Sequence, residues 1–137
     1  MHPPVPYNNC LIYLANTTDN VGRGNYYGIN GTPRVALNGT LVPVNTPLLP
    51  PAAIQAALNQ TSPVAIAVEE SGSFPTKTVN ITVSTYGDVP AGNYKLYAAV
   101  AESTVNYTSP NGESKHHDVL RAMLPNANGA DIVLAPA

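Results

Sequence analysis

Cys10 is the single cysteine of the 137-residue chain, so thiol chemistry is the first possibility to weigh. Thiol–disulfide exchange of the thioredoxin type needs two sulfurs in a Cys-x-x-Cys pair, one that attacks and one that resolves. One cysteine cannot supply both, and it cannot form an internal disulfide. The preceding Tyr7-Asn8-Asn9 does not resemble a lipoprotein cleavage site. We therefore expect Cys10 to be a small, semi-buried thiol.

His116-His117-Asp118 is the one cluster of potential metal ligands. Adjacent side chains point to opposite faces of a strand, and on a helix they lie about 100° apart, so two neighbouring histidines rarely hold the same ion. A site would need His2 or a distant carboxylate to complete its ligand set. We expect no metal site, and we expect a polar loop that precedes a strand beginning at Val119.

Other catalytic patterns are poorly supported. The chain has no Gly-x-Ser-x-Gly elbow for a nucleophilic serine. Glu69 and Glu70 are adjacent and would diverge on a strand, unlike a converging acid pair. Gly22-Arg23-Gly24 lacks the spacing and the following Lys-Ser/Thr of a phosphate-binding loop. The sequence thus predicts no catalytic residues, no cofactor and no enzymatic activity.

Arg121 is the one cation inside the hydrophobic segment 119–124. It could contact an anion or a ligand, or it could face outward or pair with a carboxylate, for which Glu102 is a candidate. We favour the second interpretation, because arginines are commonly paired or extend their head groups to water. The eight tyrosines offer a similar choice between a ligand or sugar platform and ordinary positions in β-sheet cores and edges, which we favour. The platform candidates are Tyr26, Tyr27, Tyr94, Tyr97 and Tyr107.

Six Asn-x-Ser/Thr sequences exceed what the composition would produce by chance, and each is a possible N-glycosylation site in a suitable host. The alternative is a polar, charge-poor β surface on which Asn and Thr fill outward strand positions, and we favour it. The six asparagines are Asn16, Asn30, Asn38, Asn59, Asn80 and Asn106.

Composition narrows the class of protein. Six Lys plus Arg against eight Asp plus Glu give a net charge of −2, so no basic patch for nucleic acid can be assembled. No apolar run approaches the roughly 18 residues of a membrane-spanning helix. Met1 to Pro6 lack the apolar core of a signal peptide. Fourteen prolines, ten glycines and four Asn-Gly pairs favour a β-rich protein with many turns.

The hydrophobic pattern predicts elements on both sides of residues 60–63. Before them, 34–37 and 41–44 read as a hairpin, and 52–59, behind two prolines, as a short helix. After them, alternation predicts strands around 64–68, 77–86, 93–102, 105–108 and 132–134, while 119–124 fits a strand or a helical turn. We expect an antiparallel sandwich over 63–137. Its predicted core-facing residues are Val79, Ile81, Val83, Leu96, Ala98 and Val100.

Tyr27-Gly28-Ile29, Thr32-Pro33 and Asn38-Gly39 follow one another in an order that resembles the second half of a thioredoxin fold. The resemblance implies a structural role for Thr32 and Pro33, whose peptide bond would be cis. The segments 90–102, 111–113 and 119–125 look like a family of Bacteroidota outer-membrane-associated and secreted proteins. In that family a thioredoxin-like half precedes an immunoglobulin-like sandwich.

The resemblance implies a mainly β protein with a small α/β part, divided into a partial thioredoxin-like segment, 1–62, and an incomplete immunoglobulin-like sandwich, 63–137. It also implies that the chain is a fragment of a larger precursor. We expect a non-catalytic structural or binding module, extracellular or outer-membrane-associated, that meets a protein partner or itself through open sheet edges. The alternatives are a degenerate thiol-redox protein and an extracellular ligand- or glycan-binding sandwich.

Overall fold

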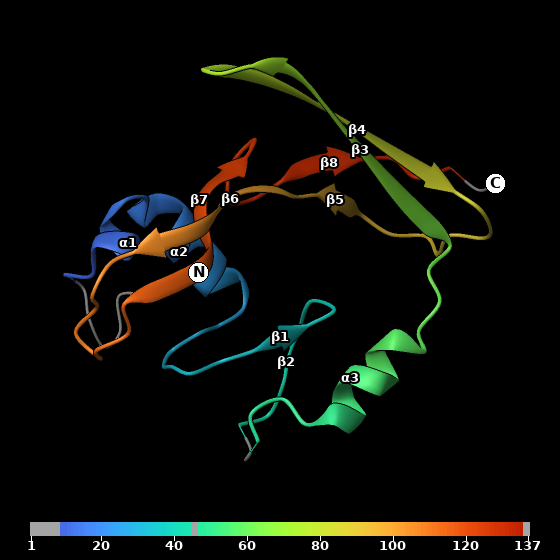
Figure 1. Ribbon diagram of the computed structural model, residues 1–137. Helices are drawn as coiled ribbons and strands as arrows, with labels where there is room; N and C mark the ends of the chain where they lie inside the picture. The colour runs from blue at the N-terminus through green and yellow to red at the C-terminus, as the bar shows by residue number, and fades with distance from the viewer. Residues whose placement is uncertain (1–8, 45–46, 136–137) are drawn as a thin grey trace. The chain divides into compact units, whose positions relative to one another are not determined.

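The computed structural model describes residues 9–44 and 47–135 (Figure 1). The chain divides into two compact units. Unit 1 comprises Met1–Asn59 and Lys95–Ala130, and unit 2 comprises Gln60–Tyr94 and Asp131–Ala137. Unit 1 is therefore built from two stretches of sequence that are far apart in the chain. The division into domains 1–62 and 63–137 stays a prediction.

Two helices that were not expected from the sequence open the described chain, α1 (Leu11–Leu14) and α2 (Thr17–Tyr26). Asn16 caps α2, because its side-chain oxygen accepts a hydrogen bond of 3.0 Å from the Asp19 backbone N–H. Asp19 places a negative charge in the first turn, where the helix dipole favours it. These two side chains offset the weak helix propensity of a segment rich in Thr, Asn and Gly.

Strands β6 (Ala98–Asn106) and β7 (Lys115–Leu124) form an antiparallel pair in unit 1. The segment 119–124 is therefore a strand and not a helical turn. The register shifts between Val100 and Ala101, so that no β6 residue stands directly opposite Arg121 in the strand pairing. Cys10, Ile12 and Val119 form a buried apolar cluster at the core of this unit, and the partly buried Tyr13, Val105 and Tyr107 pack around it.

The hairpin predicted over 34–37 and 41–44 and the helix predicted over 52–59 are both present in unit 1. Strands β1 (Ala36–Leu37) and β2 (Thr40–Leu41) pair antiparallel across Asn38 and Gly39, which have φ values of 48° and 81°. Two positive φ values at the centre of a two-residue loop are the geometry that Asn-Gly favours. Helix α3 (Pro51–Leu58) begins and ends one residue before the predicted bounds of 52–59, so that it includes the second proline, and it buries none of its residues. The Thr32–Pro33 peptide bond is cis.

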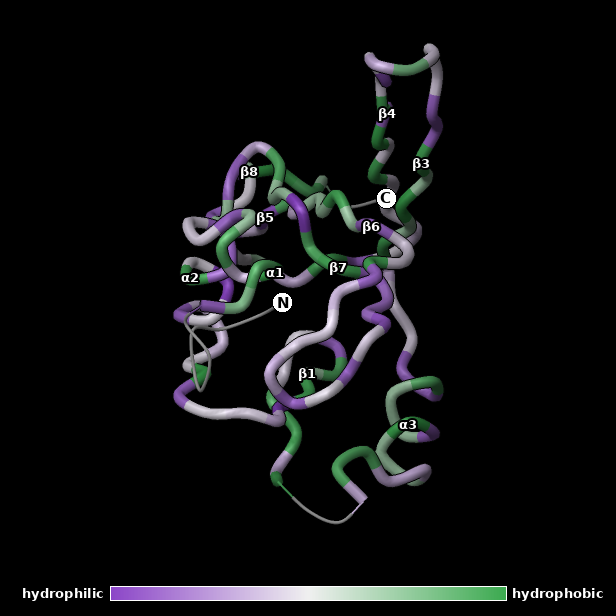
Figure 2. Tube along the Cα trace, turned by 60° about the vertical axis from the view of Figure 1, so that its left-hand side comes forward, coloured by the Kyte–Doolittle hydropathy of each residue, from purple (hydrophilic) through white to green (hydrophobic). Residues whose placement is uncertain are grey.

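Unit 2 contains the long hairpin β3–β4, in which β3 (Val64–Ser73) pairs antiparallel with β4 (Thr76–Thr85) over ten residue pairs. Figure 2 shows hydrophobic and polar residues alternating along both strands. The register places six aliphatic side chains on one face, and Asn80, Thr82 and Ser84 on the other. The six are Val64, Ile66, Val68, Val79, Ile81 and Val83.

Strand β5 (Tyr94–Leu96) pairs with β8 (Ala130–Ile132) in a short fourth sheet. Each of the four sheets formed by the described strands therefore has two strands. The chain is thus mainly β with antiparallel sheets and few helices, whereas the thioredoxin-like and immunoglobulin-like assignments stay predictions. None of the six predicted core residues of the sandwich is buried: Leu96 and Ala98 are half-buried, for example, and Val100 is exposed. Alternation assigns side chains to a face of a strand, but burial also requires a second layer on that face.

Candidate functional site

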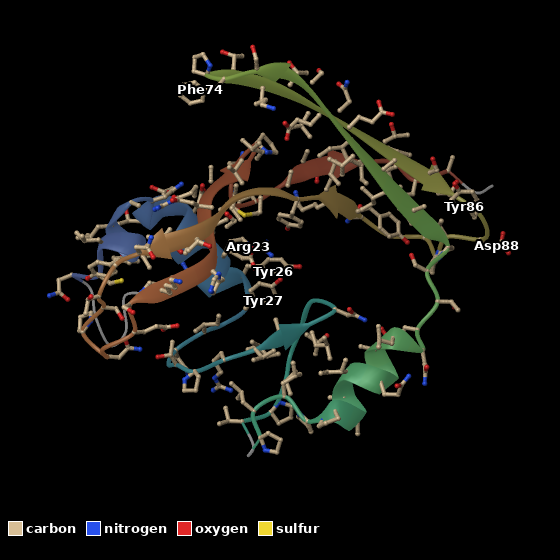
Figure 3. The ribbon with its side chains drawn as sticks, viewed as in Figure 1. Arg23, Tyr26, Tyr27, Phe74, Tyr86 and Asp88 are labelled. Carbon is tan, nitrogen blue, oxygen red and sulfur yellow. The ribbon has the colours of Figure 1, made fainter. Side chains whose placement is uncertain are left out.

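Arg23 lies among three tyrosine rings in unit 1. Its guanidinium carbon is 4.4 Å from the ring centroid of Tyr26, 4.9 Å from that of Tyr27 and 4.6 Å from that of Tyr97. These distances are within the range of favourable cation–π contacts. Arg23 Nη2 also donates a hydrogen bond of 2.9 Å to the Tyr27 hydroxyl. We call these four residues the Arg23 cluster, and Figure 3 shows three of them side by side at the end of α2.

The helix and a strand connection position this cluster. Arg23 and Tyr26 lie on α2 and Tyr27 is its C-cap, so the three stand at i, i+3 and i+4, the spacing that places side chains on one helix face. Tyr97 is the single residue between strands β5 and β6. The Tyr26 ring meets Tyr27 edge-on at 4.9 Å and Tyr97 at 5.7 Å between centroids. Tyr26 is 57% exposed, so the cluster is open to solvent on the side of this ring.

One polar atom of the cluster is unsatisfied. Arg23 Nη1 is buried and has no hydrogen-bond partner among the described residues. A guanidinium keeps its charge at every physiological pH, so this nitrogen always presents donors. Arg121 provides the contrast, because its Nε donates to Glu102 Oε2 at 2.8 Å and its Nη2 lies 2.6 Å from the same oxygen. The predicted pairing of Arg121 with Glu102 is confirmed.

The structure brings together three of the five tyrosines that formed the predicted platform, Tyr26, Tyr27 and Tyr97. The Tyr94 hydroxyl instead donates to the Pro90 carbonyl oxygen, and Tyr107 packs at the core of unit 1. In the sequence, Arg23 lies in Gly22-Arg23-Gly24, which lacks the spacing of a phosphate-binding loop and gives no other sign of a site. Its spacing of three and four residues from two tyrosines was the available signal, but that spacing has meaning only on a helix.

His116 and His117 lie within β7 and not in a loop, so the predicted loop is wrong. The pairing of His116 with Val105 and of His117 with Thr104 continues the β6–β7 ladder through these polar residues. His116 is buried, and its Nε2 lies 2.9 Å from the Tyr107 carbonyl oxygen. His117 is exposed, as expected because adjacent residues of a strand point to opposite faces and His116 points inward. No group of three metal-ligating side chains gathers within residues 9–44 and 47–135.

The other candidate residues serve local structure. Cys10 is buried in the apolar core of unit 1. Glu70 pairs with Lys77 across the β3–β4 hairpin, while Glu69 stands on the opposite face of the strand. Asn16 uses its amide nitrogen twice, donating to Asp19 Oδ2 at 2.7 Å and to the Arg121 carbonyl oxygen at 2.9 Å. The other five asparagines of the glycosylation pattern are exposed, and use of any of the six stays a prediction.

The β3–β4 hairpin carries a second candidate surface, which we call the hairpin face. It consists of the six aliphatic side chains on one side of the hairpin. Ile66 is 59% exposed and Val68 is 64% exposed. Contiguous apolar surface of this kind typically marks a site of interaction with another molecule.

Paired antiparallel strands and short helices define a mainly β protein, and one of its hairpins exposes an apolar face. Residues 22–137 match the family of outer membrane protein Omp28, so the chain belongs to that family of outer membrane proteins. No curated protein and no solved structure matches the chain. In the described part, no helix combines the length and the apolar character needed to cross a bilayer.

Proposed function

We propose that this chain is a non-catalytic structural and binding module of an envelope protein, and that it makes protein contacts through the hairpin face. The observation that carries the proposal is the exposure of Ile66 and Val68 on a ten-pair hairpin. An isolated two-stranded hairpin is only marginally stable in water. A protein surface that covers the hairpin face would stabilise the hairpin and remove this apolar area from water.

The occupant that we propose for the hairpin face is a second copy of the same chain. A two-fold dimer places one patch against itself, so the patch must be compatible with its own chemistry. The hairpin face meets this condition, because its aliphatic side chains are flanked by one acid and one base, Glu70 and Lys77, that already neutralise each other. Because the hairpin face carries no net charge, two copies of it do not repel each other, and the face does not favour a partner of either charge.

Val68→Lys is expected to abolish this dimer, because it places a charge in the middle of the buried apolar area. Ala67→Lys is the matched control, since Ala67 is the preceding residue and points to the polar face of the same strand. Sedimentation velocity over a range of concentrations measures the effect. The proposal requires a dimer for the wild type and for Ala67→Lys, and a monomer for Val68→Lys. A wild type that stays monomeric, or equal behaviour of the two variants, contradicts it.

The non-catalytic part of the proposal has its own test. Cys10 is buried, and a single sulfur cannot complete a reductase cycle. We expect the rate of insulin reduction by dithiothreitol to be the same with and without the protein. A faster rate that disappears in Cys10→Ser would contradict the proposal and would favour the degenerate thiol-redox alternative.

We further propose that the chain derives from a larger surface protein of Bacteroidota, with a thioredoxin-like half before an immunoglobulin-like sandwich. The order of the elements supports this proposal: hairpin β1–β2 and helix α3 follow Thr32-Pro33, and longer antiparallel strands come after them.

A further inference from the structure

We propose that the Arg23 cluster is a binding site for a carboxylate group. The starting observation is the buried Arg23 Nη1, which has no hydrogen-bond partner among the described residues. A buried donor left without a partner is unfavourable, and more so when the group is charged. A ligand that accepts a hydrogen bond from this nitrogen would remove the penalty. The proposal is independent of the hairpin face, which lies in unit 2.

The surroundings of Arg23 favour an anion over purely structural packing. The tyrosine rings contact the guanidinium carbon at 4.4 to 4.9 Å, and they provide π faces but no formal negative charge. Arg23 Nη2 is occupied by the neutral hydroxyl of Tyr27. The guanidinium is thus held in place by aromatic contacts, while one nitrogen and the full positive charge are left for a ligand. Arg121, whose charge is matched by Glu102, has no such capacity.

The chemistry of the site selects a carboxylate among anions. One guanidinium neutralises one charge, which is what a carboxylate carries, whereas a phosphate monoester carries about −1.5 to −2 near neutral pH. A carboxylate is also planar and fits the planar donor fork of arginine. The exposed Tyr26 ring leaves one side of the cluster open to solvent. The carboxylate could belong to a small organic acid or to the end of a peptide.

Nuclear magnetic resonance of the ¹⁵N-labelled full chain tests the site, with the Arg23 Nε–Hε signal as the reporter. This signal is assigned by its absence in Arg23→Lys. Sodium acetate probes a free carboxylate, N-acetylglycine probes a peptide terminus, and N-acetylglycinamide, which lacks the charge, is its control. Sodium chloride at matched ionic strength corrects for screening. We expect saturable shifts with acetate or with N-acetylglycine, larger than any caused by phosphate, and none with the amide or with chloride.

Arg23→Gln removes the proposed ligand-binding group, and Arg34→Gln is its matched control, since Arg34 is an exposed arginine in the same unit. The backbone amides of Tyr26 and Tyr27 report on both variants. Loss of a charged hydrogen bond predicts an affinity lower by about tenfold or more in Arg23→Gln, with no change in Arg34→Gln. If Arg23→Gln does not fold, the wild-type titrations decide alone. Equal shifts with chloride and acetate, or no saturation with either carboxylate, would overturn the proposal.

Discussion

Asp19→Ala is expected to lower the free energy of unfolding of unit 1 by about 2–4 kcal/mol, because it leaves the Met123 N–H without its acceptor and removes one of the two acceptors of the Asn16 amide. Asp19 is buried, and its Oδ2 accepts hydrogen bonds of 2.7 Å from the Met123 backbone N–H and from Asn16 Nδ2. Met123 is itself buried, so its N–H cannot turn to water. This carboxylate therefore connects the first turn of α2 to strand β7.

Urea unfolding followed by tyrosine fluorescence measures this effect in a chain that lacks tryptophan. Asp19→Asn should lose less, because an amide oxygen can still accept one hydrogen bond, although a neutral acceptor is weaker than a charged one. Asp88→Ala removes an exposed carboxylate and should change the stability by less than about 0.5 kcal/mol. Equal losses for Asp19→Ala and Asp88→Ala would show that the buried carboxylate does not hold unit 1 together.

Ile12→Ala is expected to cost about 2–5 kcal/mol, the range for truncating a buried aliphatic side chain and leaving a cavity. Ile12 is 2% exposed and belongs to the core that also contains Cys10 and Val119. Leu11, the preceding residue of the same short helix, is 60% exposed. The same denaturation experiment on Leu11→Ala provides the control, which should lose less than about 1 kcal/mol. Similar losses in the two variants would place the core of unit 1 elsewhere.

Part of the fold could be predicted because its sequence signals are local. Proline followed by alanines defines α3, Asn38-Gly39 defines a tight turn, and strict alternation defines β3 and β4. Helix α2 lacked such a signal, since Thr, Asn and Gly dominate it. The only sequence signal for α2 was a possible N-cap residue, Asn16, followed three positions later by Asp19. This pattern is weak evidence for a helix when no apolar run follows it. The partners that stabilise α2 lie on β7 and cannot be seen in a local window.

The candidate site was predictable to a similar extent. The tyrosines could be named from composition, and three of the five come together. Which tyrosines would come together could not be predicted. Tyr97 is separated from Arg23 by more than seventy residues of chain, and it becomes a neighbour of Arg23 only in the folded unit. The ion pair of Arg121 with Glu102 was predictable, but the register shift that leaves no β6 residue directly opposite Arg121 was not. Such a shift depends on how both strands pack and not on either sequence alone.

The hydrogen bond from Asn16 to the Arg121 carbonyl oxygen joins residues that are 105 positions apart. During synthesis the N-terminal helices therefore leave the ribosome long before the strand that completes their core. Until β7 follows, Ile12 and the Asn16–Asp19 pair have no surface to pack against, so early folding of this segment is not stabilised. Unit 1 should accordingly assemble late. The hairpin β3–β4, which lies between these segments in the sequence, can form earlier from its own local contacts. Any truncation upstream of residue 119 would yield a chain whose first helices remain unfolded.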